Sequence, residues 1–256
     1  MTIDEHGIDV WLAFYDEIGD ASLLASLRTL LSDDERAQEL RFRFADDRKR
    51  YLVTRALVRT VLSRYADVAP ADWSFAVNDY GRPRIADAHG AACALSFNVS
   101  HTRGLIALGV TRGRALGVDV EHLTLRDVST GIAGHFFSPS EVGELEAVPQ
   151  QRRQDRFFEY WTFKESYIKA RGMGLSIPLD KFSFHFPHDS AVGLAVEPEL
   201  GDDAARWAFW QYRPAPHYLL AICAERPHVD SRVNLLRTIP TRSHEAIALP
   251  LLRTSL

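Results

Sequence analysis

The residues with the clearest chemical potential are a carboxylate and an amine on one apolar segment. Glu165 and Lys169 lie four residues apart within FFEYWTFKESYIKARGMGLSIPLDKFSF, residues 157–184, and Trp161 lies one turn before Glu165. Four residues are about one helical turn, so these side chains leave the same face of a helix. A plain intrahelical ion pair has the same spacing and is worth only about 0.3–0.5 kcal/mol. The pair therefore fits a functional site or a structural contact.

The helix that carries this pair has a predicted end. Gly172 and Gly174 bracket the last turn, as the glycine of a helix C-cap does. Pro178 prevents continuation of the helix, and residues 181–186 alternate between apolar and polar as in a strand. We therefore expect one long helix over residues 154–171.

A second pair of chemical groups lies upstream, in the segment LGVDVE at residues 116–121. If this segment is a strand, Asp119 and Glu121 share one face and two valines take the other. Carboxylates this close repel each other, so either one is protonated or a cation lies between them, unless both face solvent. Mg²⁺ prefers oxygen ligands and is held by one or two carboxylates together with substrate phosphates. Glu165 would supply a third carboxylate.

Together, these segments resemble the signature of the phosphopantetheinyl transferase superfamily, of the long, surfactin-synthetase-activating (Sfp) type. The first motif of that family is represented here by Gly117, Asp119 and Glu121. Its second motif, W-x-x-K-E-x-x-x-K followed by G-x-G-L, and two weaker elements, G-[KR]-P and F-N-x-S-H, are also present and in the family's order. The matching residues are Trp161, Lys164, Glu165, Lys169, Gly172, Gly174 and Leu175, then Gly81, Arg82 and Pro83, then Phe97, Asn98, Ser100 and His101.

The resemblance implies an α+β fold, a pseudo-dimer of two similar halves with the active site in the cleft between them. We expect residues 1–112 to form the N-terminal half, with a basic coenzyme A-binding helix, and residues 113–228 the C-terminal half, with the metal and catalytic motifs. Residues 229–256 lack family motifs and read as a poorly anchored tail. A chain with both halves needs no partner subunit, so a monomer is expected.

The resemblance also implies a reaction. The 4′-phosphopantetheine group of coenzyme A would be transferred to a serine of an acyl or peptidyl carrier protein, leaving 3′,5′-ADP. Mg²⁺, or Mn²⁺ in its place, would be held by Asp119, Glu121 and Glu165. Glu165 or a metal-bound water would take the serine proton, and Lys169 would contact the pyrophosphate and assist the leaving group. The carrier, from fatty acid, polyketide or non-ribosomal peptide synthesis, would dock on residues 135–148.

Further residues are implied to hold the coenzyme. An arginine-rich helical pattern over residues 35–65 offers Arg50 for the 3′-phosphate, because guanidinium forks suit phosphate oxygens. Residues 100–104 are expected to form a loop that contacts phosphates. Lys164 would touch the same phosphates or be solvated. The coenzyme-binding residues implied in this way are Arg50, Arg55, Gly81, Arg82, Pro83, Ser100, His101, Lys164 and Lys169.

Two other functional classes compete with this hypothesis. The chain could be a non-catalytic module of the same fold that binds coenzyme A or a carrier protein. The presence of Asp119, Glu121, Glu165 and Lys169 together argues against a loss of catalysis. A different Mg²⁺-dependent nucleotide transferase is not supported, because the sequence has neither a glycine-rich P-loop nor a G-x-G-x-x-G motif.

Composition sets the remaining bounds. The chain has 256 residues, of which 46% are apolar and 25% charged, with a net charge of −4. This balance gives no general basic field, so nucleic-acid binding is not indicated. The acidic start lacks a signal-peptide core, and no apolar run approaches the ~20 residues of a membrane helix. Cys93 and Cys223 give no disulfide framework and read as buried thiols. We expect a cytoplasmic protein with no membrane association.

Overall fold

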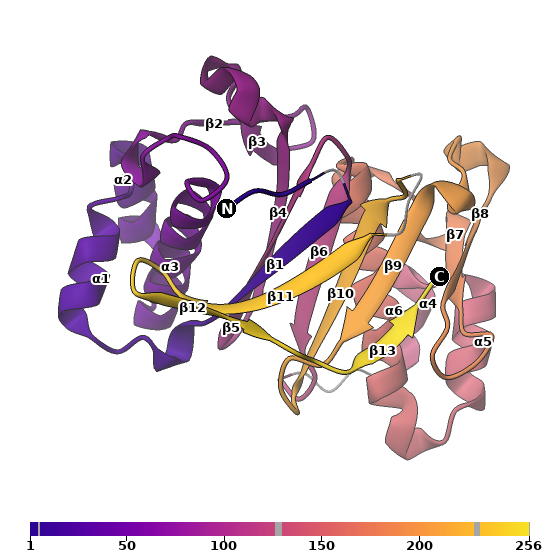
Figure 1. Cartoon of the computed structure of the whole chain (residues 1–256). Coiled ribbons are helices and arrows are strands. Elements are labelled where there is room, and N and C mark those ends of the chain that lie inside the picture. Colours follow the sequence, from indigo (N-terminus) through magenta and orange to yellow (C-terminus); the bar gives the residue numbers. More distant parts are fainter. Residues whose placement is uncertain (5, 126–129, 228–230, 256) are drawn as a thin grey trace. The chain divides into compact units, whose positions relative to one another are not determined.

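The computed structural model describes residues 1–4, 6–125, 130–227 and 231–255 (Figure 1). The chain forms two compact units that interleave along the sequence. Unit 1 consists of Met1–Val77, Pro83–Gly113 and Ser231–Ala248. Unit 2 consists of Asn78–Arg82, Arg114–Asp230 and Leu249–Leu256. Each unit combines helices with a mainly antiparallel sheet, and this confirms the predicted α+β class with two halves.

Unit 1 is built on a five-stranded sheet of order β12-β11-β1-β5-β4. β11 runs parallel to β1, and the other neighbours are antiparallel. The strands are β1 Gly7–Phe14, β4 Leu95–Thr102, β5 Leu105–Arg112, β11 Arg232–Ile239 and β12 Ser243–Ile247, and a separate hairpin pairs β2 Phe75–Val77 with β3 Pro83–Ile85. The helices are α1 Ala21–Arg28, α2 Asp33–Arg41 and α3 Ala45–Leu62, with 3₁₀ turns at Tyr15–Glu17, Pro70–Asp72 and Asp87–Ala94.

The helices of unit 1 pack on one side of its sheet (Figure 1). The capping box that the sequence predicts at Ser32 and Glu35 is present at the start of α2. The predicted continuous helix over residues 35–65 is wrong, because Phe42 and Phe44 take extended backbone angles with ψ of 129° and 140°. This break lets α3 start afresh and bury Leu52, Leu57 and its other apolar residues against the sheet.

Unit 2 is built on a four-stranded sheet of order β13-β9-β10-β6, with all neighbours antiparallel. Its strands are β6 Leu116–His122, β9 Trp207–Tyr212, β10 Tyr218–Glu225 and β13 Leu251–Thr254, and a separate hairpin pairs β7 Phe182–His185 with β8 Gly193–Val196. The helices are α4 Thr130–Phe136, α5 Pro139–Ala147 and α6 Gln150–Arg171, with 3₁₀ turns at Gly174–Ser176, Leu179–Lys181, Pro198–Leu200 and Ala204–Arg206.

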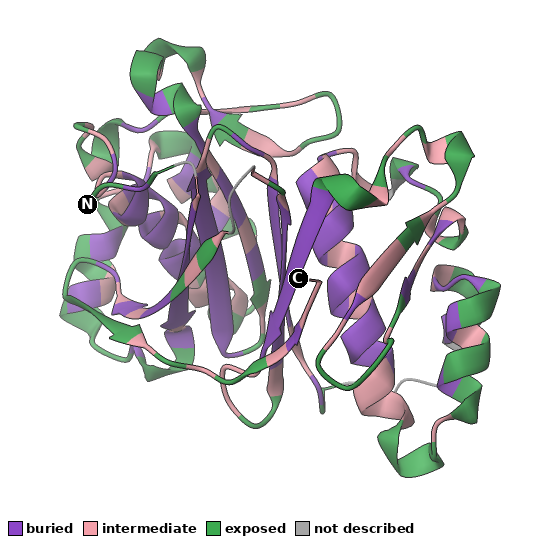
Figure 2. Ribbon diagram, turned by 45° about the vertical axis from the view of Figure 1, so that its right-hand side comes forward, coloured by how far each residue is buried: buried purple, intermediate pink, exposed green. Residues whose placement is uncertain are grey.

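The long helix α6 is the centre of unit 2. Residues 150–152 are exposed, residues 153–156 are half-buried, and the rest of the helix is mostly buried, as Figure 2 shows. An aromatic core joins the buried part to β7 and β9, with Phe163, Phe184 and Phe209 in mutual ring contact. The helix ends at Gly172, which has a φ of 68° in the left-handed region, as the sequence predicts for a C-cap.

The prediction of a poorly anchored C-terminal tail is wrong. β11 and β12 extend the sheet of unit 1, and β13 is an edge strand of the sheet of unit 2. Leu235 and Leu236 are buried, and the Asn234 side-chain amide donates to Oδ1 of the buried Asp9 at 2.8 Å. The division into three consecutive segments therefore differs from the structure, in which the last segment is shared between the two units.

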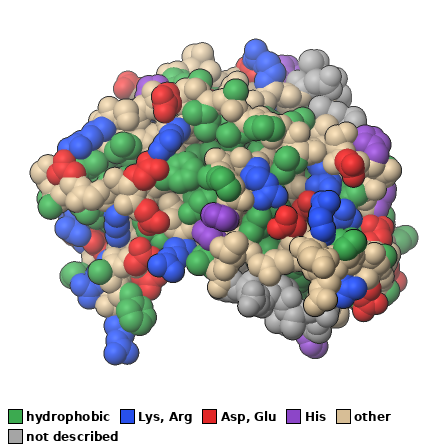
Figure 3. Space-filling view, turned by 90° about the horizontal axis from the view of Figure 1, so that it is seen from below, with side chains coloured by type: hydrophobic (Ala, Val, Ile, Leu, Met, Phe, Trp, Pro, Cys, Tyr) green, Lys and Arg blue, Asp and Glu red, His purple; other side chains and the backbone are tan. Residues whose placement is uncertain are grey.

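Three smaller observations concern composition and surface. Cys223 is buried as predicted, whereas Cys93 is exposed, because it lies in the 3₁₀ segment before β4 rather than in a strand. On the face drawn in Figure 3, Lys and Arg side chains are interspersed with Asp and Glu side chains. Among the described residues, no helix is both long and apolar enough to cross a membrane.

Candidate active site

The contact between β6 and α6 in unit 2 depends on one glycine. A Cβ atom on Gly117 would lie 2.5 Å from the Ala170 amide nitrogen and even closer to the Ser166 carbonyl oxygen. Both atoms belong to the backbone of α6, so neither can turn away as a flexible side chain could. Gly117 therefore lets α6 lie directly on β6 and brings the two predicted motifs together.

This close approach joins Lys169 to Asp119. The Nζ atom of Lys169 lies 2.6 Å from Asp119 Oδ1, and the side chains are 25% and 5% exposed. Asp119 is thus a nearly buried carboxylate held by a partly accessible ammonium. The structural alternative, in which Lys169 serves only as an intrahelical partner of Glu165, does not describe this contact.

The charges of Asp119 and Lys169 both act on the Glu165 carboxyl. Burial raises the pKa of the Glu165 carboxyl, and the nearby Asp119 carboxylate raises it further, while Lys169 opposes the shift. A carboxyl with a raised pKa binds a proton more readily near neutral pH than an ordinary glutamate does. Glu165 therefore has the electrostatic setting of a proton acceptor or of a cation ligand.

Glu121, the second carboxylate of the β6 motif, is held by an aromatic residue of α6. The indole Nε1–H of Trp161 donates to Glu121 Oε1 at 3.1 Å. Trp161 in turn packs edge-on against Phe136 of α4, with ring centroids 5.2 Å apart. The tryptophan of the second motif therefore orients a carboxylate of the first motif.

The end of α6 is tied down by the turn that contains Gly81 and Arg82. The Arg82 guanidinium donates to the carbonyl oxygens of Ala170 at 2.9 Å and Leu116 at 2.8 Å. The Asn78 side-chain amide donates to the Gly172 carbonyl oxygen at 2.8 Å. The family resemblance implies that Arg82 binds the coenzyme, and in the structure both terminal nitrogens of its guanidinium donate to backbone carbonyls of α6 and β6.

The prediction that Lys164 contacts phosphates or solvent is wrong. Its side chain is 1% exposed, and its Nζ atom lies 2.8 Å from Oε2 of Glu141, which is 0% exposed. Burial lowers the pKa of Lys164, and the Glu141 carboxylate opposes that shift. Sequence spacing places Lys164 about 100° around the helix from Glu165 but does not tell what covers that side. The structure covers it with α5 and β7.

Sequence analysis did not identify Glu141 as the partner of Lys164. Glu141 forms a capping box with Ser138 at the start of α5, and it also binds Lys164. The signal was present in the sequence as a lysine inside an otherwise apolar stretch, since a buried lysine requires an anionic partner.

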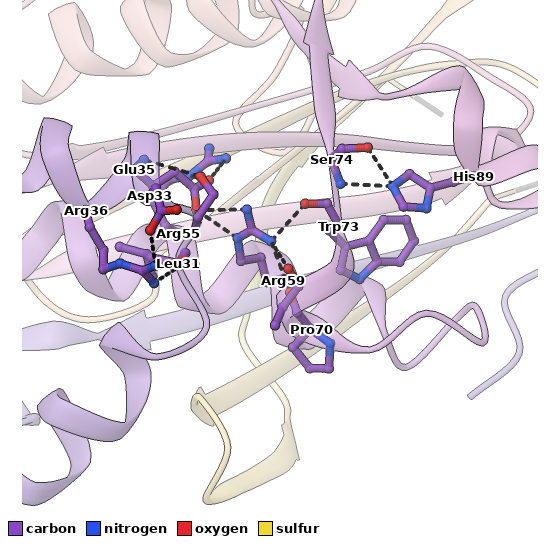
Figure 4. A network of polar contacts seen from close by, with 12 residues as sticks. Leu31, Asp33, Glu35, Arg36, Arg55, Arg59, Pro70, Trp73, Ser74 and His89 are labelled. Atoms are coloured by element: carbon purple, nitrogen blue, oxygen red, sulfur yellow. Dashed lines mark hydrogen bonds and ion pairs between the residues drawn. The ribbon is translucent and has the colours of Figure 1, made fainter.

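The predicted coenzyme contacts of unit 1 lie on α3, β3 and β4. Arg50 forms an ion pair with Asp47 at 2.6 Å, and Arg55 donates from Nε to Glu35 Oε1 at 2.6 Å. Figure 4 shows Arg55 and Arg59 converging on Glu35. Pro83 starts β3. These arginines have carboxylate partners within unit 1, and their roles toward a ligand remain predictions.

Ser100 and His101 occupy a strand rather than the predicted loop. β4 continues to Thr102, so the turn to β5 is limited to Arg103 and Gly104. Ser100 is buried and His101 is exposed, as alternation along a strand requires. The short turn is accommodated by Gly104, which has a φ of 86°.

The carboxylates of unit 2 supply the donor chemistry for a hard cation. Asp119, Glu121 and Glu165 offer only oxygen atoms, which Mg²⁺ and Mn²⁺ both accept. Within the part of the chain that the structure describes, no group of three or more His, Cys, Asp or Glu side chains is arranged to hold a metal ion. The three-carboxylate ligand set remains a prediction.

Comparison with known proteins identifies the family. The family model described as 4′-phosphopantetheinyl transferase superfamily matches residues 115–223, and the model of the N-terminal part of 4′-phosphopantetheinyl transferases matches residues 20–111. The chain is 33% identical to the 4′-phosphopantetheinyl transferase ffp of Bacillus subtilis over 210 residues, 82% of this chain and 89% of the relative. The chain belongs to the 4′-phosphopantetheinyl transferase superfamily. The family predicted from the motifs is thereby confirmed.

Other members of the 4′-phosphopantetheinyl transferase superfamily match over similar lengths. The transferase Sfp of Bacillus subtilis strain 168 is 32% identical over 208 residues, 81% of this chain and 88% of the relative. The transferase HetI of a Nostoc species is 34% identical over 176 residues, 69% of this chain and 73% of the relative. The superfamily match at residues 115–223 includes the whole Asp119, Glu165 and Lys169 cluster of this transferase.

Proposed function

We propose that this transferase moves the 4′-phosphopantetheine group of coenzyme A onto a serine of an acyl or peptidyl carrier protein. The observation that carries the proposal is the cluster at the β6–α6 contact. It combines a buried carboxylate, Asp119, with the Lys169 ammonium and with Glu165, whose pKa is raised by burial. Family membership supplies the reaction to which this cluster is assigned.

The reaction is an in-line displacement at phosphorus. The carrier serine oxygen forms a bond to the β-phosphorus of coenzyme A. The bond from that phosphorus to the bridging oxygen breaks, and 3′,5′-ADP leaves with the electron pair. Glu165 takes the serine proton, for which a raised pKa suits a carboxylate working near neutral pH. Lys169 offsets negative charge on the departing bisphosphate.

We assign Asp119, Glu121 and Glu165 as the residues that would hold Mg²⁺, with Mn²⁺ as an alternative. When bound, the cation would neutralise charge on the pyrophosphate. Its oxygen preference fits the three carboxylates. In the structure the Lys169 ammonium already balances the charge of Asp119.

Candidate residues for coenzyme recognition are proposed on each unit separately. Arg50 is the candidate for the 3′-phosphate, which would compete with Asp47 for its guanidinium. Arg55, Ser100 and His101 are further candidates on the same unit. Gly81, Arg82 and Pro83 are assigned to the adenine end through their turn backbone, because the Arg82 guanidinium binds backbone carbonyls.

The protein partner would dock beside the cluster. Residues 135–148, which contain the end of α4 and all of α5, remain our candidate docking segment. Phe136 in this segment contacts Trp161, which bonds Glu121, so docking there would reach the site through packed side chains. We further propose a monomer working in the cytoplasm, where the free thiols of Cys93 and Cys223 would be stable.

Product analysis tests the proposed function. Purified protein, coenzyme A and Mg²⁺ are incubated with several apo carrier proteins, and both products are measured by mass spectrometry and chromatography. The proposal expects one phosphopantetheine added per carrier and an equal amount of 3′,5′-ADP, with both lost on chelation. Coenzyme A binding without either product would favour a non-catalytic binding module. Neither binding nor product would overturn the assignment.

A further inference from the structure

The pair formed by Lys164 and Glu141 connects four elements of unit 2 at one junction. Lys164 Nζ donates to the carbonyl oxygens of Leu179 at 2.7 Å and Phe182 at 2.8 Å, in addition to its 2.8 Å contact with Glu141. An ammonium has three N–H donors, and these three oxygens use all of them. Lys164 therefore has no donor left for a phosphate.

Glu141 completes the junction with its own backbone contacts. Its Oε2 accepts from the Ser138 amide at 2.8 Å, and its Oε1 accepts from the Phe184 amide at 2.9 Å. Through one ion pair, α6 is thus bonded to the first turn of α5, to β7 and to the 3₁₀ turn before it. The ammonium also lies 4.1 Å from the centroid of the Phe182 ring, so the junction is enclosed by apolar groups.

A buried ion pair is not the arrangement expected if Lys164 and Glu141 contributed only to stability. Burying two charges costs desolvation energy, and apolar side chains of similar volume are often equally or more stabilising. Apolar packing, however, tolerates small rotations and slides, whereas hydrogen bonds to fixed backbone atoms have defined directions. The junction therefore fixes the rotation of α6 about its own axis.

We propose that Lys164 and Glu141 are positioning residues for the transfer reaction, which hold α6 in the rotation that turns Glu165 toward Asp119. The inference rests on the proposed function of that cluster. Lys164 directly precedes Glu165, so any turn of the helix at the junction moves the Glu165 carboxyl. A displacement of about 1 Å at a reacting group can cost about 100-fold in rate.

Lysine labelling of the unaltered protein tests whether Lys164 is a buried structural residue and not a coenzyme ligand. The chain has four lysines, Lys49, Lys164, Lys169 and Lys181. Reductive methylation followed by residue-level mass spectrometry should leave Lys164 unmodified in the native protein, with or without coenzyme A, while Lys181, whose side chain is 37% exposed, reacts. Modification of native Lys164 that coenzyme A prevents would make it a ligand-binding residue and overturn the inference.

Paired variants test whether the Lys164–Glu141 ion pair positions Glu165 for catalysis. Lys164→Met with Glu141→Gln removes both buried charges and keeps an acceptor at position 141. The matched control, Lys181→Met with Glu197→Gln, makes the same changes in an exposed ion pair of 3.0 Å. In folded protein, the buried pair should lower kcat at least about tenfold with the KM for coenzyme A within about twofold of the parent, and the control should change neither.

The remaining outcomes are also decisive. A folded double variant with parental kcat would overturn the positioning role, as would a large rise in KM at unchanged kcat. If the double variant does not fold, Glu141→Asp keeps both charges and draws the carboxylate back by one methylene, and it should show the same loss of kcat. A parent protein that modifies no carrier would overturn the proposed function and this inference together, and only that result does so.

Discussion

The Nζ atom of Lys169 lies 2.6 Å from Oδ1 of Asp119, and this contact joins the last turn of α6 to the middle of β6. Through this ion pair, a side chain of the first family motif holds a side chain of the second in place. The contact also places the positive charge of Lys169 beside the Asp119 carboxylate. In the proposed reaction the same ammonium offsets negative charge on the departing 3′,5′-ADP.

Replacing the Lys169 amine tests its contribution to both catalysis and stability. Lys169→Met is expected to lower kcat for carrier modification by about 10²–10³-fold, the usual cost of losing one group that stabilises developing charge. Without metal the Tm should also fall, because the variant leaves the nearly buried Asp119 carboxylate without its cationic partner. Steady-state kinetics and thermal unfolding check both expectations. Lys181→Met is the control, and full activity of Lys169→Met would contradict the role.

A methyl group at position 117 should force the two motifs apart. Gly117→Ala would press Cβ against the backbone of α6, and we expect a loss of at least about 3 kcal/mol in the free energy of unfolding. Gly143→Ala in α5 is the matched control, because among the described residues no atom other than its chain neighbours and nearby helix backbone lies within 4 Å of the added Cβ. That change should stabilise by up to about 1 kcal/mol. Equal denaturation midpoints for the two variants would contradict the close approach.

The raised pKa of Glu165 predicts a stability effect with a defined sign. Between the ordinary carboxyl pKa of about 4.3 and the raised value, the folded state holds more protons than the unfolded state. Stability from this group therefore falls as pH rises through that window. Without metal, Glu165→Gln should raise Tm at pH 7, and the difference should shrink as pH falls through the raised pKa.

A neighbouring glutamate provides the control for this measurement. Glu159 lies on the same helix but forms ion pairs with Arg156 at 2.8 Å and Arg253 at 3.2 Å. Glu159→Gln should therefore lower Tm at pH 7. Since about 1 kcal/mol corresponds to about 2–4 °C for a chain of this size, scanning calorimetry resolves either effect. A lower Tm for Glu165→Gln at pH 7 would contradict the electrostatic description of the cluster.

The bond from Trp161 to Glu121 predicts a change in metal affinity. Trp161→Phe removes the indole donor and keeps an aromatic ring against Phe136. Loss of such an orienting bond typically weakens metal binding by about 10–100-fold. Mn²⁺ binding, followed by electron paramagnetic resonance, measures this directly. Trp207→Phe removes an equivalent bond to Asp202 at 2.9 Å and should leave Mn²⁺ affinity unchanged. Equal affinity in both variants would argue against Glu121 as a ligand.

Local features of the fold could be predicted where neighbouring residues decide the outcome. The end of α6 follows from Gly172, and the starts of α2 and α5 follow from capping boxes at Ser32 and Ser138. The shared face of Asp119 and Glu121 follows from the two-residue period of a strand. Each of these depends on residues within one turn or one strand of each other.

The features that sequence reasoning missed depend on distant partners. β11 pairs with β1, and the Asn234 contact with Asp9 spans 225 positions, so no local pattern announces it. Lys164 reads as a surface lysine until α5 and β7 cover its side of the helix. The bonds from Arg82 to the carbonyl oxygens of Ala170 and Leu116 likewise join positions 88 and 34 residues apart.

The most direct test of the account compares the parent with Glu165→Gln and Asp119→Asn in one assay. Each protein is incubated with coenzyme A, Mg²⁺ and the same apo carrier, and the intact mass of the carrier is recorded over time. We expect the parent to add one 4′-phosphopantetheine group, chelation to stop the reaction, and both variants, though folded, to be slower by at least about 100-fold. Modification at parental rates by either folded variant would contradict the assignment of the reaction to this cluster.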